Sequence, residues 1–221
     1  MVVKSGAVQL AGGDVFSSSS SKPSGLKRAS EMERFSDTKE RRGEVGNRET
    51  PGSVVEIVGN ARLTAAVRWT VDTQRSGNSV AWISAREDGF YPPDLEANGV
   101  DLKKLPVVKV KEQPETVEAV DLLVRSGFFS LVVVDWNSAW PLEGALQSRF
   151  YRLARRHGAT LLFLGEEGDA GGIALVPLRI RATRRRRSPG MYTLLLEVVR
   201  DKQGVGFSGQ EVVVYGPPGL R

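Results

Sequence analysis

From residue 53 onward, hydrophobic residues fall into short continuous runs that alternate with segments of helical spacing. The runs predict buried strands and the segments between them predict helices. The predicted strands are 54–58, 80–83, 107–110, 131–134 and 160–164, and the predicted helices are 64–74, 92–98, 114–125 and 143–157. Continuously apolar strands that alternate with helices are typical of parallel sheets buried on both faces. We therefore expect an α/β fold with a mostly parallel central sheet and helices on both faces.

After Gly172 the pattern changes to an alternation of polar and apolar positions. It predicts three closely spaced strands, at 173–182, 191–200 and 210–215, joined by turns at 187–190 and 202–204. Such short connections favour antiparallel pairing. We therefore expect antiparallel strands at the C-terminal end of the sheet.

The first fifty residues have a different composition, with a serine run at 17–21 and mixed charges but few aliphatic residues at 22–48. Such a composition buries too little apolar surface to fold alone. We expect residues 1–50 to form a flexible or partner-docking segment, and residues 51–221 to form one core domain.

Composition excludes several kinds of site. The chain has no cysteine and a single histidine, His157, which argues against disulfides, metal centres and a histidine-based catalytic triad. No apolar run is long enough to span a bilayer, and the N-terminus lacks a signal-peptide core. We therefore expect a cytoplasmic protein without a membrane contact or a bound metal.

The net charge of +5 is unevenly distributed, because residues 143–187 contain ten arginines and only four acidic residues. This asymmetry predicts a basic face for nucleic acid or for an acidic protein, although a solvated surface would give the same composition. Three of the ten arginines share one face of the predicted helix 143–157, Arg155 lies on the same helix, and the other six lie on or near a predicted hairpin. The candidate basic face comprises Arg149, Arg152, Arg156, Arg179, Arg181, Arg184, Arg185, Arg186 and Arg187.

The order of the elements, together with several local sequences, resembles the ATPase core of the RecA recombinases over roughly residues 52–216. VVEIVG at 54–59 is similar to the strand that leads into their phosphate-binding loop, VAWISA at 80–85 to their second strand, and LVVVD at 131–135 to their Walker B strand. The resemblance implies a RecA-like P-loop NTPase core.

The residues that would hold a nucleotide in that family have changed. A P-loop continues as a glycine-rich turn, a lysine and a serine or threonine. In this chain the turn begins with Gly59 and Asn60. Arg62 lies nearest the position of the P-loop lysine, and Leu63 takes the position of the serine or threonine. Arg86 occupies the register of the water-activating glutamate, with Glu87 one residue later, whereas Asp135 matches the Walker B aspartate.

Phosphoryl transfer needs a cradle, a cation and a positioned water together. We therefore expect a degenerate nucleotide site at Gly59, Asn60, Arg62, Glu87 and Asp135, with no catalytic residue, no ATP hydrolysis and no cofactor. A divergent NTPase that uses Arg62, Glu87 and Asp135 is the alternative.

Both loops that contact DNA in RecA are short in this chain. A RecA-like core with a degenerate P-loop and short loops resembles ImuA and the related SulA-like proteins. That resemblance implies an accessory role in SOS-linked translesion DNA synthesis, with RecA, an ImuB-type polymerase-like protein and an error-prone polymerase as partners, and a nucleoid-associated location. Trp136, Trp140 and Phe207 are candidate interface anchors, although the tryptophans could equally fill space beside the shortened loop. A basic module that contacts the DNA backbone through the arginine hairpin is the other candidate function.

Overall fold

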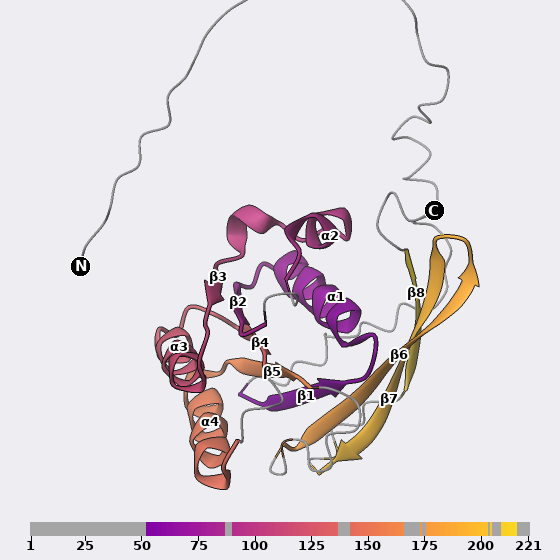
Figure 1. Ribbon diagram of the computed structural model, residues 1–221. Helices are drawn as coiled ribbons and strands as arrows, with labels where there is room; N and C mark the ends of the chain where they lie inside the picture. The colour runs from indigo at the N-terminus through magenta and orange to yellow at the C-terminus, as the bar shows by residue number, and fades with distance from the viewer. Residues whose placement is uncertain are drawn as a thin grey trace, which may run out of the picture. The chain divides into compact units, whose positions relative to one another are not determined.

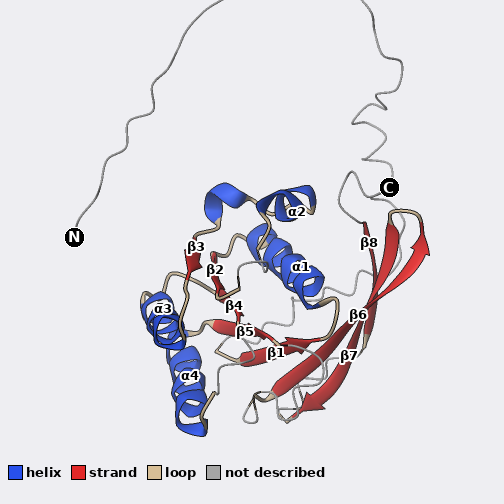
Figure 2. Cartoon of the chain, viewed as in Figure 1, coloured by secondary structure: helices blue, strands red, loops and turns tan. Residues whose placement is uncertain are grey.

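The computed structural model describes residues 52–86, 90–136, 142–165, 173, 176–202, 204 and 209–215 (Figure 1). In these ranges the chain forms one eight-stranded sheet with helices on both faces (Figure 2). The strands are β1 Val54–Val58, β2 Val80–Ser84, β3 Val107–Lys109, β4 Leu131–Asp135, β5 Thr160–Leu164, β6 Leu178–Ser188, β7 Met191–Asp201 and β8 Gln210–Tyr215. The helices are α1 Arg62–Arg75, α2 Pro92–Ala97, the short 3-10 helix η3 Leu102–Lys104, α3 Gln113–Arg125 and α4 Gly144–His157.

The sheet has the strand order β3-β2-β4-β5-β1-β6-β7-β8. Every pairing from β3 to β6 is parallel, whereas β6, β7 and β8 pair antiparallel. The predicted α/β class is therefore confirmed, including its antiparallel C-terminal strands. Since β5 lies between β4 and β1, the C-terminal ends of these three strands meet at one edge of the sheet.

Each face of the sheet carries its own hydrophobic core. One core joins α1 and α2 to the strands and includes Trp69 and Trp82, which are 6% and 0% exposed as expected for core residues. The other joins α3 and α4 to the opposite face and includes Phe150 and Phe163. On β4 the side chains alternate between the two cores, which explains why the whole strand is apolar up to its final aspartate.

The predicted bounds of the first late strand, 173–182, are wrong. The strand β6 begins at Leu178 and runs to Ser188, so its four consecutive arginines lie on a strand instead of at a turn. Residues 184–186 pair with β7, and Arg187 lies at a register shift. Buried and half-buried residues alternate only as far as Thr183, and the rest of the strand is exposed. Alternation therefore could not reveal the outer half of the strand. The turn itself is residues 189–190, with Gly190 at a φ of 71°.

Candidate functional site: a closed phosphate-loop position beside an arginine hairpin

The connection between β1 and α1 is the turn formed by residues 59–61, and this turn is attached to β6. The backbone N–H of Ala61 donates a hydrogen bond of 3.1 Å to the carbonyl oxygen of Ala182. Gly59 has a φ of +102°, and a Cβ atom at this position would lie 2.4 Å from the same oxygen. Only glycine allows the turn to approach the strand this closely.

The attachment uses groups that a phosphate-binding loop would direct at its ligand. A P-loop binds phosphate through backbone N–H groups at the start of a helix. Here the N–H of Ala61 is bonded to β6, and the N–H of Arg62 donates to the carbonyl oxygen of Gly59 at 3.3 Å. The Arg62 guanidinium also donates to Gly59, through Nη1 at 3.4 Å. Leu63, which takes the place of a magnesium-binding hydroxyl, packs against the core.

Asp135 lies at the end of β4 and is 1% exposed. It is in register with Ser84 of β2 on one side and with Leu164 of β5 on the other. Its carbonyl oxygen accepts the N–H of Ala85 at 3.3 Å, so the ends of β2 and β4 are joined. The fold therefore brings Asp135 to the same sheet edge as Gly59, as in a nucleotide site, but the aspartate is enclosed. The predicted Glu87 lies outside the described residues.

A buried ion pair between β1 and β6 was not anticipated from the sequence. The Glu56 side chain is 4% exposed and lies 3.0 Å from Nε of Arg179, whose side chain is 14% exposed. Both carboxylate oxygens of Glu56 also accept the N–H of Ile173 at 3.3 Å. The prediction that Arg179 belongs to a basic binding face is therefore wrong, because its charge is used inside the protein. A glutamate in the middle of an apolar strand was the available signal.

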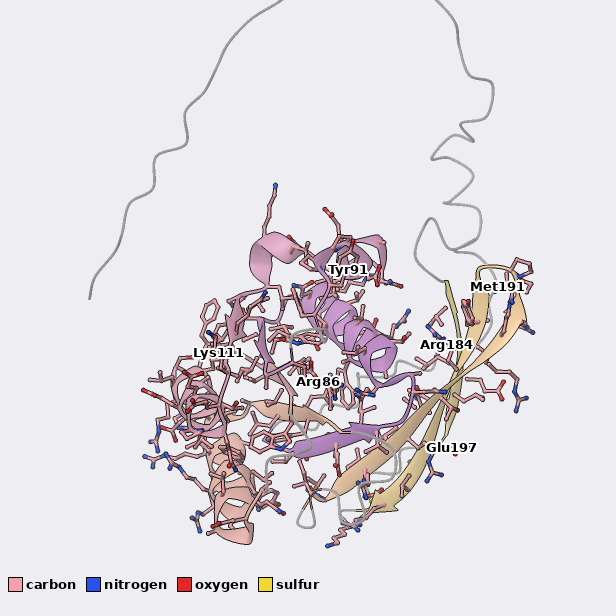
Figure 3. All side chains as sticks on the ribbon, in the orientation of Figure 1. Arg86, Tyr91, Lys111, Arg184, Met191 and Glu197 are labelled. Carbon is pink, nitrogen blue, oxygen red and sulfur yellow. The ribbon has the colours of Figure 1, made fainter. Side chains whose placement is uncertain are left out.

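The outer half of the β6–β7 hairpin presents its arginines to solvent. Residues 184–187 are all exposed. The Arg184 guanidinium lies 4.8 Å from the centre of the Tyr192 ring, and its backbone N–H donates to Oδ1 of Asn60 at 3.3 Å. Figure 3 shows Arg184, Met191 and Glu197 on this hairpin. The hairpin is thus joined directly to the turn at 59–61, so two of the predicted site groups are neighbours.

Arg181, the remaining arginine of the predicted strand face, is half-buried and lies closer to the centre of the sheet. Its Nη1 is 3.9 Å from Oε2 of Glu197 on β7. Its charge is therefore partly balanced by a partner on the neighbouring strand.

The arginines of α4 divide into two groups. Arg149, Arg152 and Arg156 are all exposed, but Arg149 also lies 2.7 Å from Oδ1 of Asp121 on α3. Asp121 also pairs with Arg125 at 2.6 Å. The hydrogen bond from Arg125, followed by that from Arg149, holds the pKa of Asp121 below its ordinary value of 3.8 although partial burial opposes the shift. Arg149 therefore helps to join α3 to α4.

Of the predicted interface anchors, only Trp136 lies in the described residues. It is 5% exposed and meets the Phe163 ring edge-on, with ring centres 5.9 Å apart. It is a core residue and not an exposed interface anchor. Trp140 and Phe207 lie outside the described part of the chain.

Within the described ranges, no group of three or more histidine, cysteine, aspartate or glutamate side chains is arranged to hold a metal ion. The same ranges contain no helix that is both long and apolar enough to cross a bilayer.

Comparisons with known proteins identify the type of fold. No protein-family model matches the chain. The RecA proteins of Mycobacterium ulcerans and Rubrobacter xylanophilus are 27% and 28% identical to it over 172 residues, which are 75% of this chain and 44% and 45% of those proteins. Among solved structures, the RadB recombinase superposes with a TM-score of 0.52 at 19% identity, covering 75% of this chain and 87% of RadB. The flagellar accessory protein FlaH from Methanocaldococcus jannaschii superposes with a TM-score of 0.58 at 14% identity, covering 78% and 88%.

The chain has a RecA-like fold. It spans less than half the length of these curated RecA relatives. In open α/β sheets, ligands bind beyond the carboxyl ends of the parallel strands. In this RecA-like domain that edge carries the turn at 59–61, the buried Asp135 and, beside them, the arginine hairpin.

Proposed function

We propose that the protein is a non-catalytic RecA-like adaptor in SOS-linked translesion DNA synthesis, and that it binds RecA, an ImuB-type polymerase-like protein, or both. The observation that carries the proposal is the hydrogen bond from Ala61 to Ala182. The bond attaches the turn to a strand at the position where a P-loop surrounds phosphate. A domain that keeps the scaffold and loses this cradle is suited to binding other proteins.

The side chains beside the turn support the same proposal. Arg62 bonds to the carbonyl of its own turn, Leu63 packs against the core, and Asp135 is enclosed at the end of β4. To bind a nucleotide at this edge, the turn would have to separate from β6. A divergent ATPase that uses Arg62, Glu87 and Asp135 remains the less favoured alternative for this reason.

DNA binding through the hairpin is a second candidate function, and it is compatible with the first. It is supported by four consecutive exposed arginines on an ordered strand, one of them held against Tyr192. Arginines in this arrangement can follow a phosphate backbone without reading its sequence. We place this contact at Arg184, Arg185, Arg186 and Arg187, with Arg152 and Arg156 of α4 as a separate exposed basic group.

A pull-down with the full chain as bait tests the adaptor proposal. Purified bacterial RecA and an ImuB-type protein are offered separately, with and without single-stranded DNA, and a nuclease-treated sample removes DNA bridging. The adaptor proposal predicts capture of at least one of the two proteins after nuclease treatment. Capture that depends on DNA throughout would favour the DNA-binding module instead, and capture of neither protein would contradict the adaptor proposal.

A further inference from the structure

A pocket lies at the sheet edge opposite the turn at 59–61. It is formed by three segments that each precede a parallel strand, namely residues 74–79 before β2, 103–106 before β3 and 128–129 before β4. These three strands are neighbours in the sheet, so their N-terminal ends converge. The pocket has a volume of about 500 Å³, which is within the range of binding clefts.

Hydrogen bonds fix the walls of the pocket, each joining a lining residue to a residue of a neighbouring element. The Gln74 side chain donates to the carbonyl of Asp101 at 3.0 Å and accepts its N–H at 2.9 Å. The N–H of Ser130 donates to the carbonyl of Ser79 at 3.0 Å, and the N–H of Trp82 donates to the carbonyl of Pro106 at the same distance. The pocket is therefore preformed, which lowers the entropic cost of binding a partner.

An exposed aromatic side chain stands at this pocket. Phe128 is 67% exposed, although its backbone N–H is held by Oγ of Ser126 at 3.2 Å and its ring meets Phe129 edge-on at 5.1 Å. Phe129, Leu105 and Pro106 supply further apolar surface. An ordered phenylalanine beside a preformed apolar pocket is typical of an anchor point in a protein interface.

The charge around the pocket indicates the partner. Among the described residues that line it, Lys103 and Lys104 carry a charge and none is acidic. Asp101 lies nearby, and its carboxylate accepts the N–H of Lys103 at 3.1 Å and lies 3.3 Å from Nζ of Lys104. It therefore balances the charge of Lys104 and leaves that of Lys103. A net positive charge beside an apolar pocket complements a peptide in which an aromatic or large aliphatic residue is flanked by carboxylates.

We propose that this pocket docks an acidic peptide segment of a partner protein, with one large apolar side chain inserted beside Phe128. A single-stranded nucleic acid fits less well, because backbone recognition needs a continuous basic track. Among the described lining residues, the basic ones are the two neighbours Lys103 and Lys104. The docking site does not depend on the proposed adaptor function. The pull-down can fail while the pocket still selects a peptide, and the two outcomes are distinguishable.

Selection from a phage-displayed library of random dodecapeptides tests the proposal, with the full-length chain as bait and the Phe128→Ser variant for counter-selection. Two further variants complete the set. Lys103→Glu with Lys104→Glu reverses the charge, and Leu122→Ser is the matched control, because Leu122 is 64% exposed but lies outside the pocket. We expect enriched peptides with an aromatic or large aliphatic residue among acidic ones. In fluorescence anisotropy, these peptides should bind the Phe128→Ser and charge-reversed variants at least tenfold more weakly than the wild type. Their affinity for Leu122→Ser should equal that for the wild type.

Several results would overturn the proposal. One is a selection in which every enriched peptide binds the wild-type chain and Phe128→Ser equally well. Another is a selection that enriches basic peptides. Loss of single-stranded DNA affinity in Phe128→Ser would identify a nucleic-acid site instead. Loss of self-association in the same variant would identify a second copy of the chain as the occupant.

Discussion

The backbone N–H of Ala61 and the carbonyl oxygen of Ala182 are joined by a 3.1 Å hydrogen bond between the β1–α1 turn and β6. Two adjacent contacts support the bond, namely the close approach of Gly59 to Ala182 and the hydrogen bond from Arg184 to Asn60. Together they attach a turn that would surround phosphate in a P-loop to a strand that carries four exposed arginines. The turn thus supports the hairpin structurally.

Replacement of Gly59 by alanine tests how closely the turn is attached. The new Cβ would lie 2.4 Å from the Ala182 oxygen at a φ of +102°, so backbone strain and a steric clash add. We expect a loss of roughly 3 kcal/mol or more in the free energy of unfolding, measured by urea denaturation. Gly77→Ala is the control, since Gly77 also has a positive φ of +79° but nothing within 4 Å of its Cβ position. It should cost only about 1–2 kcal/mol, and equal losses for both variants would show that the attachment is loose.

The Glu56–Arg179 pair predicts strong coupling between two strands. Glu56→Leu or Arg179→Met alone leaves the other charge buried, so each should cost about 3–5 kcal/mol of stability. The double variant Glu56→Leu with Arg179→Met removes both charges and should recover most of that loss. About 1 kcal/mol should remain missing, because Ile173 would lose its acceptor. Additive losses in a double-mutant cycle by urea denaturation would contradict a direct interaction.

The strands of the parallel sheet could be predicted because burial on both faces leaves a continuous apolar sequence, and β5 has the predicted bounds. The outer half of β6 could not be predicted, because its residues are exposed on both faces of the strand and show no alternation of polar and apolar positions. The bond between Ala61 and Ala182 joins two backbone groups far apart in the chain and leaves no side-chain signal. Glu56 did leave a signal, since an isolated carboxylate in an apolar strand requires a buried partner.

The α3–α4 contact predicts a pH effect centred on Asp121. Its pKa is lowered in the folded protein, first by the Arg125 hydrogen bond. The stabilisation is therefore present above the ordinary carboxyl pKa and is lost as the pH falls through the folded value. Asp121→Asn should lower the urea midpoint at about pH 7 and match the wild type at about pH 2. Arg149→Gln should keep part of this dependence because Arg125 remains, and a midpoint difference that does not change with pH would contradict the assignment.

The hairpin arginines predict a salt-dependent affinity for DNA. Replacement of Arg184, Arg185, Arg186 and Arg187 by glutamine should weaken binding to duplex DNA. It should also reduce the slope of log K against log salt by up to about 0.9 for each lost phosphate contact. A matched control removes the same charge elsewhere, with glutamine at the exposed residues Arg75, Lys109, Lys111 and Lys202. Fluorescence anisotropy over a range of salt concentrations measures the affinity of each variant for DNA. If both quadruple variants lower the affinity equally, the affinity depends on net charge and not on the hairpin.

Nucleotide binding by the full chain tests the central claim most directly. Isothermal titration with Mg-ATP, combined with a phosphate-release assay with and without single-stranded DNA, compares the wild type with Asp135→Ala. Because the turn at 59–61 is attached to β6 and Asp135 is enclosed, we expect no saturable binding at millimolar ATP and no release above the background of the assay, with identical traces for the variant. ATP turnover that is abolished by Asp135→Ala would contradict the account.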